Sequence, residues 1–370
     1  RVLALAAERL APGGRIYVGD VRSLDLQEAF HASVEGRRAA GRATVGELRR
    51  RIREAVTDEE ELLVAPDFFR EIARFVPGLS CERVSPKRGS HRNELTRFRY
   101  QAVLRRVEQC RPADEVLPEW LVWRDIPEGL LGVTRLLEDA RPAVLAIAGI
   151  PNARLGYENA LLATLGAASD PDAVVAIDEA AAWDADSGAD PEALHGLAHR
   201  FGYGVAVTFS DAAEAGALDV VFQRDPSAPV AWSGRPRGRA GVLSDIDAFA
   251  NDPLLGRQSR QLGPELRGFM QERLPDYMLP AAYVFLARWP ITPNGKVDRH
   301  ALPDPSWQRT AGSRFVAPAH GSERRIAEIW QAVLGLDRIG ATDNFFEIGG
   351  HSLLATQIVS RLRAAFGQEV

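Results

Sequence analysis

Two stretches rich in proline, glycine or alanine interrupt this chain and limit it to several separately folded units. Residues 233–241 read SGRPRGRAG, and residues 316–321 read VAPAHG. Such composition favours turns and linkers over continuous helices or strands. The length of 370 residues allows two or three domains, and a hydrophobic content of 46% is enough to form their cores. We therefore expect a multidomain architecture.

The residues before the first interruption predict mixed α/β structure in two successive parts. In the first part, apolar residues at helical spacing follow an Arg-rich helical stretch at 26–57: Phe68, Phe69, Ile72, Phe75 and Val76. Strands are expected at RIYVGD (15–20), CERVSPKRG (81–89) and ELTRFRYQAVLRRV (94–107), the last with Thr96, Phe98, Tyr100, Ala102 and Leu104 alternating with polar positions. The pattern restarts near residue 112, with a strand, a turn and a helix across 142–166 and further strands at 203–210 and 217–224.

The residues after the first interruption predict two smaller units. The first, at 249–305, contains a helix at 262–274, the turn LPDYMLP, a strand at 282–286 and the segment WPITPNGKVDRHALP. The second, at 318–370, begins with a helix that Ser322 can cap. Its two helices carry the apolar faces Ile326, Ile329, Trp330, Val333 and Leu334, then Leu354, Ile358, Leu362 and Ala365.

Charge and composition argue against several classes of partner. A net charge of −5 and a pI near 5.9 provide no electrostatic footprint for nucleic acid or an anionic membrane. No apolar run approaches the roughly 18 residues of a membrane span, and no signal peptide is visible. The two cysteines, Cys81 and Cys110, form neither a disulfide framework nor a metal cluster. We expect a cytoplasmic protein without a metal site.

The segment DNFFEIGGHSLLATQIVSRLR, residues 343–363, places Ser352 at the predicted amino end of a helix. Unpaired backbone N–H groups and the helix dipole favour a negative group there, so a phosphodiester on the serine oxygen would be well placed. Gly349 and Gly350 would leave the approach to Ser352 open. The alternative from spacing alone is an ordinary N-capping serine.

This segment closely resembles the attachment site of carrier domains in nonribosomal peptide synthetases. The resemblance implies that Ser352 receives 4′-phosphopantetheine from coenzyme A through a phosphopantetheinyl transferase, and that the new thiol carries an acyl or peptidyl thioester. Asp343, Gly349, Gly350, His351 and Leu353 would form the surrounding motif. His351 is interpreted as a surface residue, which is usual for elongation carriers of this family.

Lys296 lies in a predicted tight turn, TPNGKVDR, where Asn294 and Gly295 can supply positive φ angles. Lys296 and Lys87 are the only lysines among 45 basic residues, and for Lys87 an ordinary surface position is the simpler interpretation. Residues 275–303 are similar to the end of the adenylation domain of the same synthetases. The resemblance implies that Lys296 contacts the carboxylate and α-phosphate when an amino acid is activated with ATP and magnesium. The alternative is that Lys296 is an ordinary exposed turn lysine. The large lobe of the adenylation domain is expected outside this sequence, which would leave Lys296 without an active site here.

The segments PGGRIYVGDVRSLDLQEAFHAS (12–33) and KRGSHRNELTRFRYQAVL (87–104) look like the later part of a methyltransferase domain embedded in some synthetases. GIPNARL (149–155) and GYGVAVTFSD (202–211) resemble its carboxy-terminal extension. The resemblance implies a partial class I methyltransferase-like doubly wound sheet in 1–110 and an α+β extension in 111–240. No GxGxG loop for S-adenosylmethionine occurs, and that first half of the domain is expected to precede this sequence.

Ligands of doubly wound sheets bind at the carboxyl ends of strands, so Asp20, Arg22 and His31 are candidate methyltransferase site residues. The alternative interpretation is that Asp20 and Arg22 form a strand-end ion pair or a turn, and that His31 lies on a helix surface.

The order of these parts predicts a segment of a synthetase module that activates and N-methylates an amino acid. The 249–305 unit would be a small α+β adenylation subdomain, and 318–370 an all-α carrier, a truncated helical bundle. Its partners would be condensation, adenylation-core and thioesterase domains. Two alternatives remain: a non-catalytic carrier or docking protein, and an independent S-adenosylmethionine-dependent methyltransferase with an unrelated tail.

Overall fold

The chain divides into two compact units, Arg1–Asn251 and Asp252–Val370, and each is described by itself. The computed structural model describes residues 1–39, 41–107, 118–175, 188–211, 215–225, 246–275, 278–280, 283–286, 289–292, 296–302, 318–319, 321–334, 339–343, 345, 348, 350 and 352–367.

The first sheet of the N-terminal unit has the strand order β2-β1-β4-β3. Its strands are β1 (Arg15–Ser23), β2 (Leu63–Val64), β3 (Leu79–Pro86) and β4 (Arg99–Arg106). Strand β1 is parallel to β2, whereas β4 is antiparallel to both of its neighbours. Three strands therefore share one direction, and the sheet is mixed. The β1–β4 register shifts between Val18 and Val21, where Asp20 has a φ of 59°.

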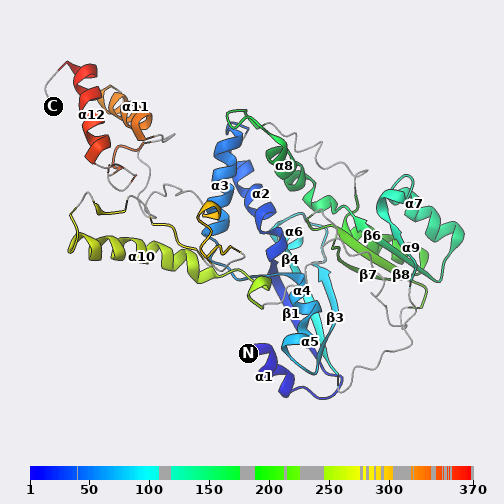
Figure 1. Ribbon diagram of the computed structural model, residues 1–370. Helices are drawn as coiled ribbons and strands as arrows, with labels where there is room; N and C mark the ends of the chain where they lie inside the picture. The colour runs from blue at the N-terminus through cyan, green and yellow to red at the C-terminus, as the bar shows by residue number, and fades with distance from the viewer. Residues whose placement is uncertain are drawn as a thin grey trace. The chain divides into compact units, whose positions relative to one another are not determined.

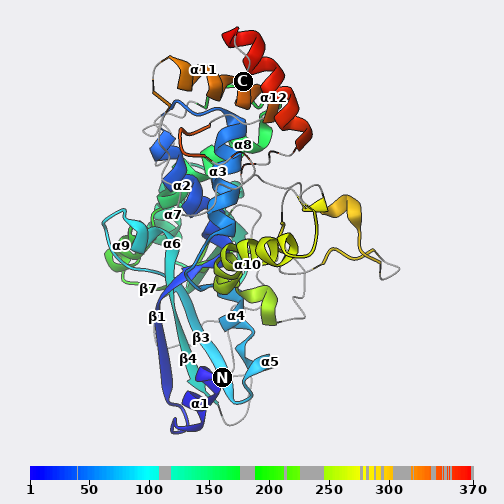
Figure 2. The same cartoon turned by 90° about the vertical axis from the view of Figure 1, so that its left-hand side faces the viewer.

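Two helices form where one Arg-rich helical stretch was expected. Helix α2 spans Gln27–Ala39 and α3 spans Val45–Thr57. A capping box at Thr44, whose side chain accepts a hydrogen bond from Glu47 N, begins α3 and separates the two helices. Figures 1 and 2 show α2 and α3 side by side, and α2 also contacts the later helix α8 (Gly156–Ala167). The other helices of this part are α1 (Val2–Glu8), α4 (Pro66–Arg70), α5 (Ile72–Phe75) and α6 (Glu94–Phe98).

The prediction of a strand beginning at residue 94 is wrong for its first turn. Thr96 and Phe98 belong to the short helix α6, and extended structure begins only at Arg99. The cause is a local capping box in which the Asn93 side chain accepts from Thr96 N and the Thr96 side chain accepts from Asn93 N. These bonds satisfy backbone groups of a helical turn before the apolar alternation can form a strand.

The second sheet has the order β5-β6-β8-β7, with β5 parallel to β6 and the remaining pairs antiparallel. Its strands are β5 (Trp120–Val122), β6 (Val144–Ile150), β7 (Gly204–Phe209) and β8 (Leu218–Gln223), and its helices are α7 (Leu130–Arg135), α8 and α9 (Pro191–Phe201). The predicted strand, turn and helix across 142–166 are confirmed as β6 and α8. All six residues of β8 are buried, which is expected of a central strand covered on both faces.

One apolar core is shared by the two sheets. Tyr100 and Leu104 of β4 belong to the same buried cluster as Ile147 of β6 and Phe222 of β8. The rings of Tyr100 and Phe209 meet edge to face with centroids 6.0 Å apart. Because both sheets bury their apolar faces in one cluster, the N-terminal unit is a single packed body.

The last residues of the N-terminal unit lie against the first sheet. Phe249 is buried, and its ring contacts those of Phe68 and Phe75. The Asn251 side chain accepts a hydrogen bond from Leu63 N at 2.8 Å and donates one to Glu61 O at 2.9 Å. Residues 246–251 therefore complete the edge of the sheet at β2.

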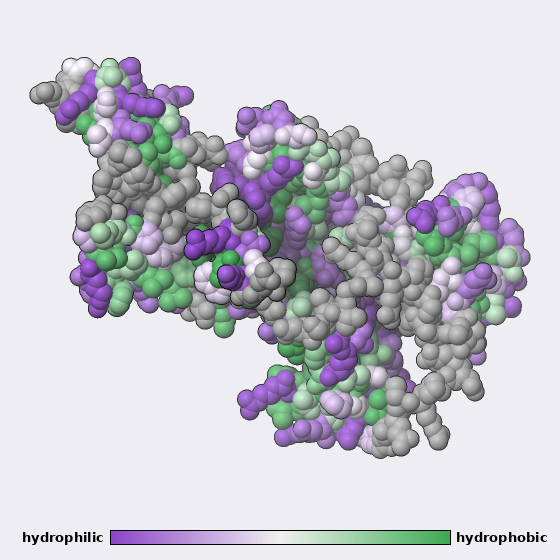
Figure 3. Space-filling model, viewed as in Figure 1, coloured by the Kyte–Doolittle hydropathy of each residue, from purple (hydrophilic) through white to green (hydrophobic). Residues whose placement is uncertain are grey.

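The C-terminal unit contains three α-helices within its described residues: α10 (Pro253–Gln271), α11 (Ser322–Leu334) and α12 (Ser352–Phe366). Helix α10 begins before the predicted residue 262 because the Asp252 side chain caps it and Pro253 occupies its first turn. No strand forms at the described residues 283–286 of the predicted strand. Figure 3 shows apolar patches over α10, whose described side chains include the exposed Leu254, Leu262, Leu266 and Phe269.

Candidate functional site

The loop that leads into α12 is anchored to α11 by apolar contacts. Ile339 and Ile348 are buried in a small cluster with Ala327 of α11. The ring of Phe345 meets the Trp330 indole edge to face, with centroids 5.2 Å apart. This burial fixes the loop at both ends and in its middle, so the start of α12 is held in place relative to α11.

Hydrogen bonds fold the same loop into two tight turns. Asp343 accepts a hydrogen bond from Gly340 N at 2.6 Å and donates its own N–H to Gly340 O at 3.2 Å. Gly350 donates its N–H to Phe345 O at 2.8 Å. A side chain at Gly350 would overlap the carbonyl oxygen and ring of Phe345, so this close approach needs glycine. Two residues further on, the chain enters α12.

Ser352 is the first residue of α12, a helix of 15 residues. The first N–H groups of a helix have no partner within it, and the dipole adds partial positive charge at that end. Helix amino ends of this kind are common binding sites for phosphate groups. The backbone arrangement is therefore compatible with a phosphodiester on Ser352. Of the other predicted motif residues, Gly349 and His351 lie outside the described residues.

Lys296 is exposed. Its backbone N–H donates to Thr292 Oγ1 at 3.3 Å, and its carbonyl accepts from Thr292 N at 2.7 Å. An isolated antiparallel bridge joins Ile291 to Val297. The structure thus holds Lys296 at a fixed backbone position, whereas Asn294 and Gly295 lie outside the described residues.

A charged cluster lies at the carboxyl end of β1, in the N-terminal unit. Arg22 Nη2 is 2.9 Å from Glu59 Oε2, and Arg22 Nη1 is 3.2 Å from Glu61 Oε2. His31 Nε2 lies 3.2 Å from the same Glu59 oxygen. Arg99, directly opposite Arg22 in the β1–β4 register, contacts Glu61 at 2.7 Å. Two of the predicted residues, Arg22 and His31, therefore contact the same carboxylate, that of Glu59.

The structure contradicts two parts of the alternative interpretation, the ion pair between Asp20 and Arg22 and the surface position of His31. Asp20 pairs with Lys87 rather than with Arg22, and its side chain is 58% exposed. Lys87 thus has a specific partner. His31 is only 8% exposed, so it does not lie on a helix surface. The sequence reasoning missed Glu59 and Glu61 because they belong to the acidic run 58–61, which would ordinarily be a solvated face.

Burial governs the charge of His31. Burial lowers the pKa of His31 below its usual value, and the Arg22 guanidinium acts in the same direction, while Glu59 and Glu35 oppose the shift. The imidazole is therefore neutral at pH 7. The Arg22 guanidinium also lies over the Phe30 ring at 3.8 Å, which fixes its plane beside Glu59.

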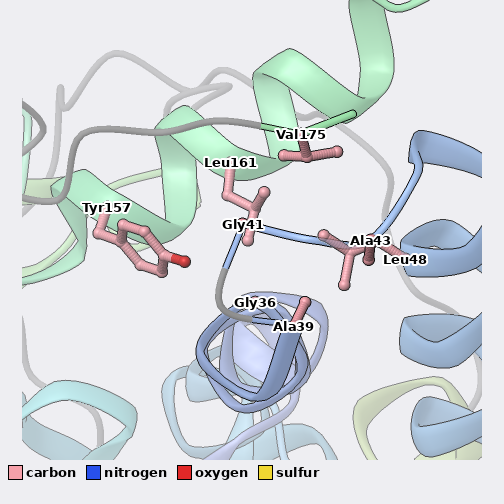
Figure 4. Close-up of a pocket in the computed structure, with 8 residues that line it drawn as sticks. All are labelled: Gly36, Ala39, Gly41, Ala43, Leu48, Tyr157, Leu161 and Val175. Carbon is pink, nitrogen blue, oxygen red and sulfur yellow. The ribbon is translucent and has the colours of Figure 1, made fainter. Parts of the chain in front are cut away.

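A cavity of about 50 Å³ lies between α2, α3 and α8. Figure 4 shows that its walls come from the Gly36 and Gly41 backbone, Leu48, and Tyr157 and Leu161 of α8. We interpret it as a packing gap between helices.

Neither a metal site nor a membrane span is found in the parts of the chain that the structure describes. There, no group of three or more His, Cys, Asp or Glu side chains could hold a metal ion. Within the same ranges no helix has both the length and the apolarity that crossing a membrane requires.

Comparison with protein families identifies the C-terminal segment. Residues 324–370 match the family described as the phosphopantetheine attachment site. This range contains α11 except for its first two residues, the anchored loop and α12. The class of protein that the helices and the loop define is therefore a carrier domain, whose covalent cofactor is 4′-phosphopantetheine. A serine hydroxyl at the start of a helix is chemically suited to bear that group.

Curated relatives extend the likeness to the whole chain. A chondramide synthase of Chondromyces crocatus is 37% identical over 374 residues, covering 98% of this chain and 9% of the relative. A probable non-canonical nonribosomal peptide synthetase of Salinispora arenicola is 38% identical over 370 residues, covering 100% of this chain and 4% of the relative. A bassianolide nonribosomal cyclodepsipeptide synthetase of Beauveria bassiana is 30% identical, covering 98% and 12%.

Two solved structures also match, over limited parts of the chain. A docking-domain complex of the Pax nonribosomal peptide synthetase is 46% identical over 16% of this chain, with a TM-score of 0.15 and 56% of its own length covered. A four-domain nonribosomal peptide synthetase bound to AMP and glycine is 27% identical over 46% of this chain, with a TM-score of 0.16 and 10% of its own length covered. At these TM-scores, neither supports a conclusion about the fold.

The chain belongs to the nonribosomal peptide synthetases and represents a segment of their modular sequence. It spans 9% of the chondramide synthase and 4% of the Salinispora synthetase.

Proposed function

We propose that this chain is the part of a synthetase module that carries an aminoacyl or peptidyl thioester on phosphopantetheine attached to Ser352. The match of residues 324–370 to the phosphopantetheine attachment family carries this proposal. Support comes from the backbone, since the turns at Gly340 and Gly350 lead directly to Ser352 at the start of α12. A phosphopantetheinyl transferase would supply the group from coenzyme A.

The test is the intact mass of the full chain after incubation with coenzyme A and a broad-specificity phosphopantetheinyl transferase. We expect the mass to rise by one phosphopantetheinyl group in the wild type and not in Ser352→Ala. Ser360→Ala is the matched control, because Ser360 is an exposed serine on the same helix. Loading of Ser352→Ala, or no loading of the wild type and the Ser360→Ala control, would contradict the proposal.

For Lys296 we propose contact with the carboxylate and α-phosphate of an activated amino acid, with ATP and magnesium bound by the rest of an adenylation domain. The exposed position of Lys296 and the hydrogen bonds between its backbone and Thr292 support this role. A lysine at a fixed backbone position can direct one charge to a single phosphate or carboxylate group. The adenylation core, condensation and thioesterase domains would be its neighbours in the module.

For the N-terminal unit we propose the later part of a methyltransferase-type domain that N-methylates the carried amino acid. Its support is the sheet in which β1, β2 and β3 share one direction, with Arg22 and His31 at the carboxyl end of β1. Ligands of doubly wound sheets bind at such ends. The relatives align over both units, which disfavours an independent methyltransferase with an unrelated tail.

The absence of a glycine-rich GxGxG loop from the sequence predicts that this chain alone does not bind S-adenosylmethionine tightly. Isothermal titration calorimetry of the full chain with S-adenosylmethionine is the measurement. We expect no saturable heat at micromolar protein, and a tight, saturable isotherm would show that the cofactor half of the site lies within these residues.

A further inference from the structure

Phe345 connects the loop before α12 to helix α11 through both its backbone and its ring. The carbonyl oxygen of Phe345 accepts the Gly350 N–H at 2.8 Å, and its ring meets Trp330 edge to face with centroids 5.2 Å apart. Gly350 is buried, and α12 begins two residues later at Ser352. One residue therefore links the backbone just before Ser352 to an aromatic contact with α11.

Gly350 is constrained by contact rather than by its backbone conformation. Its φ is not among the positive values that several other described glycines have. A Cβ atom at Gly350 would overlap both the carbonyl oxygen and the ring of Phe345. A backbone oxygen cannot turn aside as the end of a flexible side chain can, so a larger residue would displace the turn itself. Glycine at this position thus allows close packing against Phe345, which is a different role from keeping the approach to Ser352 open.

Trp330 acts in this contact through its ring and not through its N–H group. Within the residues that the structure describes, the indole Nε1 of Trp330 is buried and has no hydrogen-bond partner. A buried donor without an acceptor costs free energy, whereas an edge-to-face aromatic pair stabilises beyond the area it buries. What Trp330 contributes to the loop is therefore an aromatic surface for Phe345, and a phenylalanine at this position can supply the same surface.

We propose that Phe345 is a positioning residue for the transfer of phosphopantetheine to Ser352. In that transfer the serine hydroxyl oxygen forms a bond to the phosphorus that bears pantetheine in coenzyme A. The P–O bond to the second phosphate breaks, 3′-phosphoadenosine 5′-phosphate leaves with the electron pair, and the hydroxyl proton is released. Phe345 acts on this reaction by holding the backbone of the Gly350 turn. The inference rests on the proposed attachment at Ser352.

Positioning of this kind has a kinetic signature of its own. The attacking oxygen must align with the phosphorus and its leaving group, so the rate within the bound complex is sensitive to the placement of the first turn of α12. Binding of the carrier to the transferase uses a larger surface, which a small shift of one residue leaves largely intact. Loss of positioning should therefore lower kcat for loading and leave KM for the carrier unchanged.

The test measures initial rates of loading of the full chain, with saturating coenzyme A and a broad-specificity phosphopantetheinyl transferase. Phe345→Leu keeps an apolar side chain and removes the ring, so we expect kcat to fall about fivefold, the value of an edge-to-face contact. Phe345→Tyr keeps the ring and should load at the wild-type rate. Phe269→Leu, at an exposed phenylalanine of α10, is the matched control. A site that needs only apolar volume would accept leucine without loss of rate.

Substitution of Trp330 tests the same contact from the side of α11. Trp330→Phe keeps an aromatic surface and removes the unpartnered N–H, so the loading rate should be retained. Trp330→Ala removes the surface and should lower kcat at least as much as Phe345→Leu does. Far-UV circular dichroism and thermal unfolding of each variant show whether the chain is folded when the rate is measured.

Substitution of Gly350 separates close packing from an open approach. Gly350→Ala should lower kcat about a hundredfold, because the overlap with the Phe345 carbonyl shifts the start of α12. Gly268→Ala is the control, since an added Cβ there meets nothing within 4 Å. If glycine serves the contact with Phe345, adding Phe345→Leu to Gly350→Ala should slow loading no further. If glycine only keeps the approach open, the two effects should multiply.

Three results would overturn the inference: a folded Phe345→Leu that loads at the wild-type rate, a folded Trp330→Phe as slow as Trp330→Ala, or effects of Phe345→Leu and Gly350→Ala that multiply. Any of these, with normal loading of the wild type and none of Ser352→Ala, removes only the role of Phe345. Failure of the wild type to load contradicts the carrier function itself.

Discussion

At the scale of single residues, Glu192 shows how one carboxylate connects two distant segments. Arg88 donates hydrogen bonds to both carboxylate oxygens of Glu192, from Nε at 2.6 Å and from Nη2 at 2.8 Å. The backbone N–H of Gly89 donates to the same carboxylate at 2.8 Å. The hydrogen bond from Arg88, aided by the backbone N–H of Gly89, lowers the pKa of Glu192 from 4.5 to about 2. The loop after β3 is thereby tied to the first turn of α9.

This pKa predicts how stability depends on acid. Because the pKa of folded Glu192 is depressed, its contribution is present above pH 4.5 and is lost as the pH falls toward about 2. Glu192→Gln should lower the free energy of unfolding at pH 7 by about 1 kcal/mol. This value allows for solvent screening, because the Arg88–Glu192 pair is partly exposed. Near pH 2 the difference should largely vanish.

Urea unfolding at pH 7 and near pH 2 measures the effect of Glu192→Gln. Glu128→Gln is the control, because Glu128 pairs with Arg135 in the open, where both side chains are at least half exposed. A Glu192→Gln variant as stable as the wild type at pH 7 would refute this account of the Arg88 contact.

At the scale of elements, the sequence predicts what local spacing determines. Apolar periodicity correctly predicts α11 over Ser322–Leu334 and the strand β6 followed by α8. Periodicity fails where a cap overrides it, as at Asn93 before α6 and at Asp252 before α10. Both caps were visible as residue types, Asn followed three residues later by Thr, and Asp followed by Pro.

The candidate site at β1 is predictable only in part, for a related reason. The rule on strand ends selects Asp20, Arg22 and His31, of which Arg22 and His31 both lie beside Glu59. Glu59 comes 28 residues after His31, and only the packing of α2 with α3 brings it to the imidazole. No local pattern specifies that contact. The motif around Ser352 is different, because it is continuous in sequence and its residues fold into one loop and one helix.

At the scale of the whole N-terminal unit, Arg154 joins the two sheets. Its side chain is 1% exposed and donates to the carbonyl oxygens of Lys87, Gly89 and Thr96, and it also pairs with Asp190. The first three of these residues precede β4 of the first sheet, whereas Arg154 follows β6 of the second. The hydrogen bonds therefore couple the sheets in addition to the shared apolar core.

Arg154→Met should destabilise the N-terminal unit by about 3 kcal/mol, because it leaves buried acceptors without donors. Hydrogen exchange should then accelerate in β4 and β8 together, since the two sheets share one core. Chemical denaturation and exchange mass spectrometry provide the measurements. Arg135→Met, at an exposed pair with Glu128, should change the free energy of unfolding by about 0.5 kcal/mol or less. Faster exchange confined to one sheet would show that the sheets are independent.

The core shared by the two sheets also determines where related synthetases can exchange sequence. Recombination of two synthetase genes between β4 and β5 would combine Tyr100 from one parent with the residue that replaces Phe209 in the other. It would likewise separate Arg97 from its own ion-pair partner, Glu158. A junction after Asn251 leaves both contacts within one parental sequence, together with the hydrogen bonds from Asn251 to the β2 edge. We therefore expect residues 1–251 to be exchanged as one unit, both in evolution and in the engineering of chimaeric synthetases.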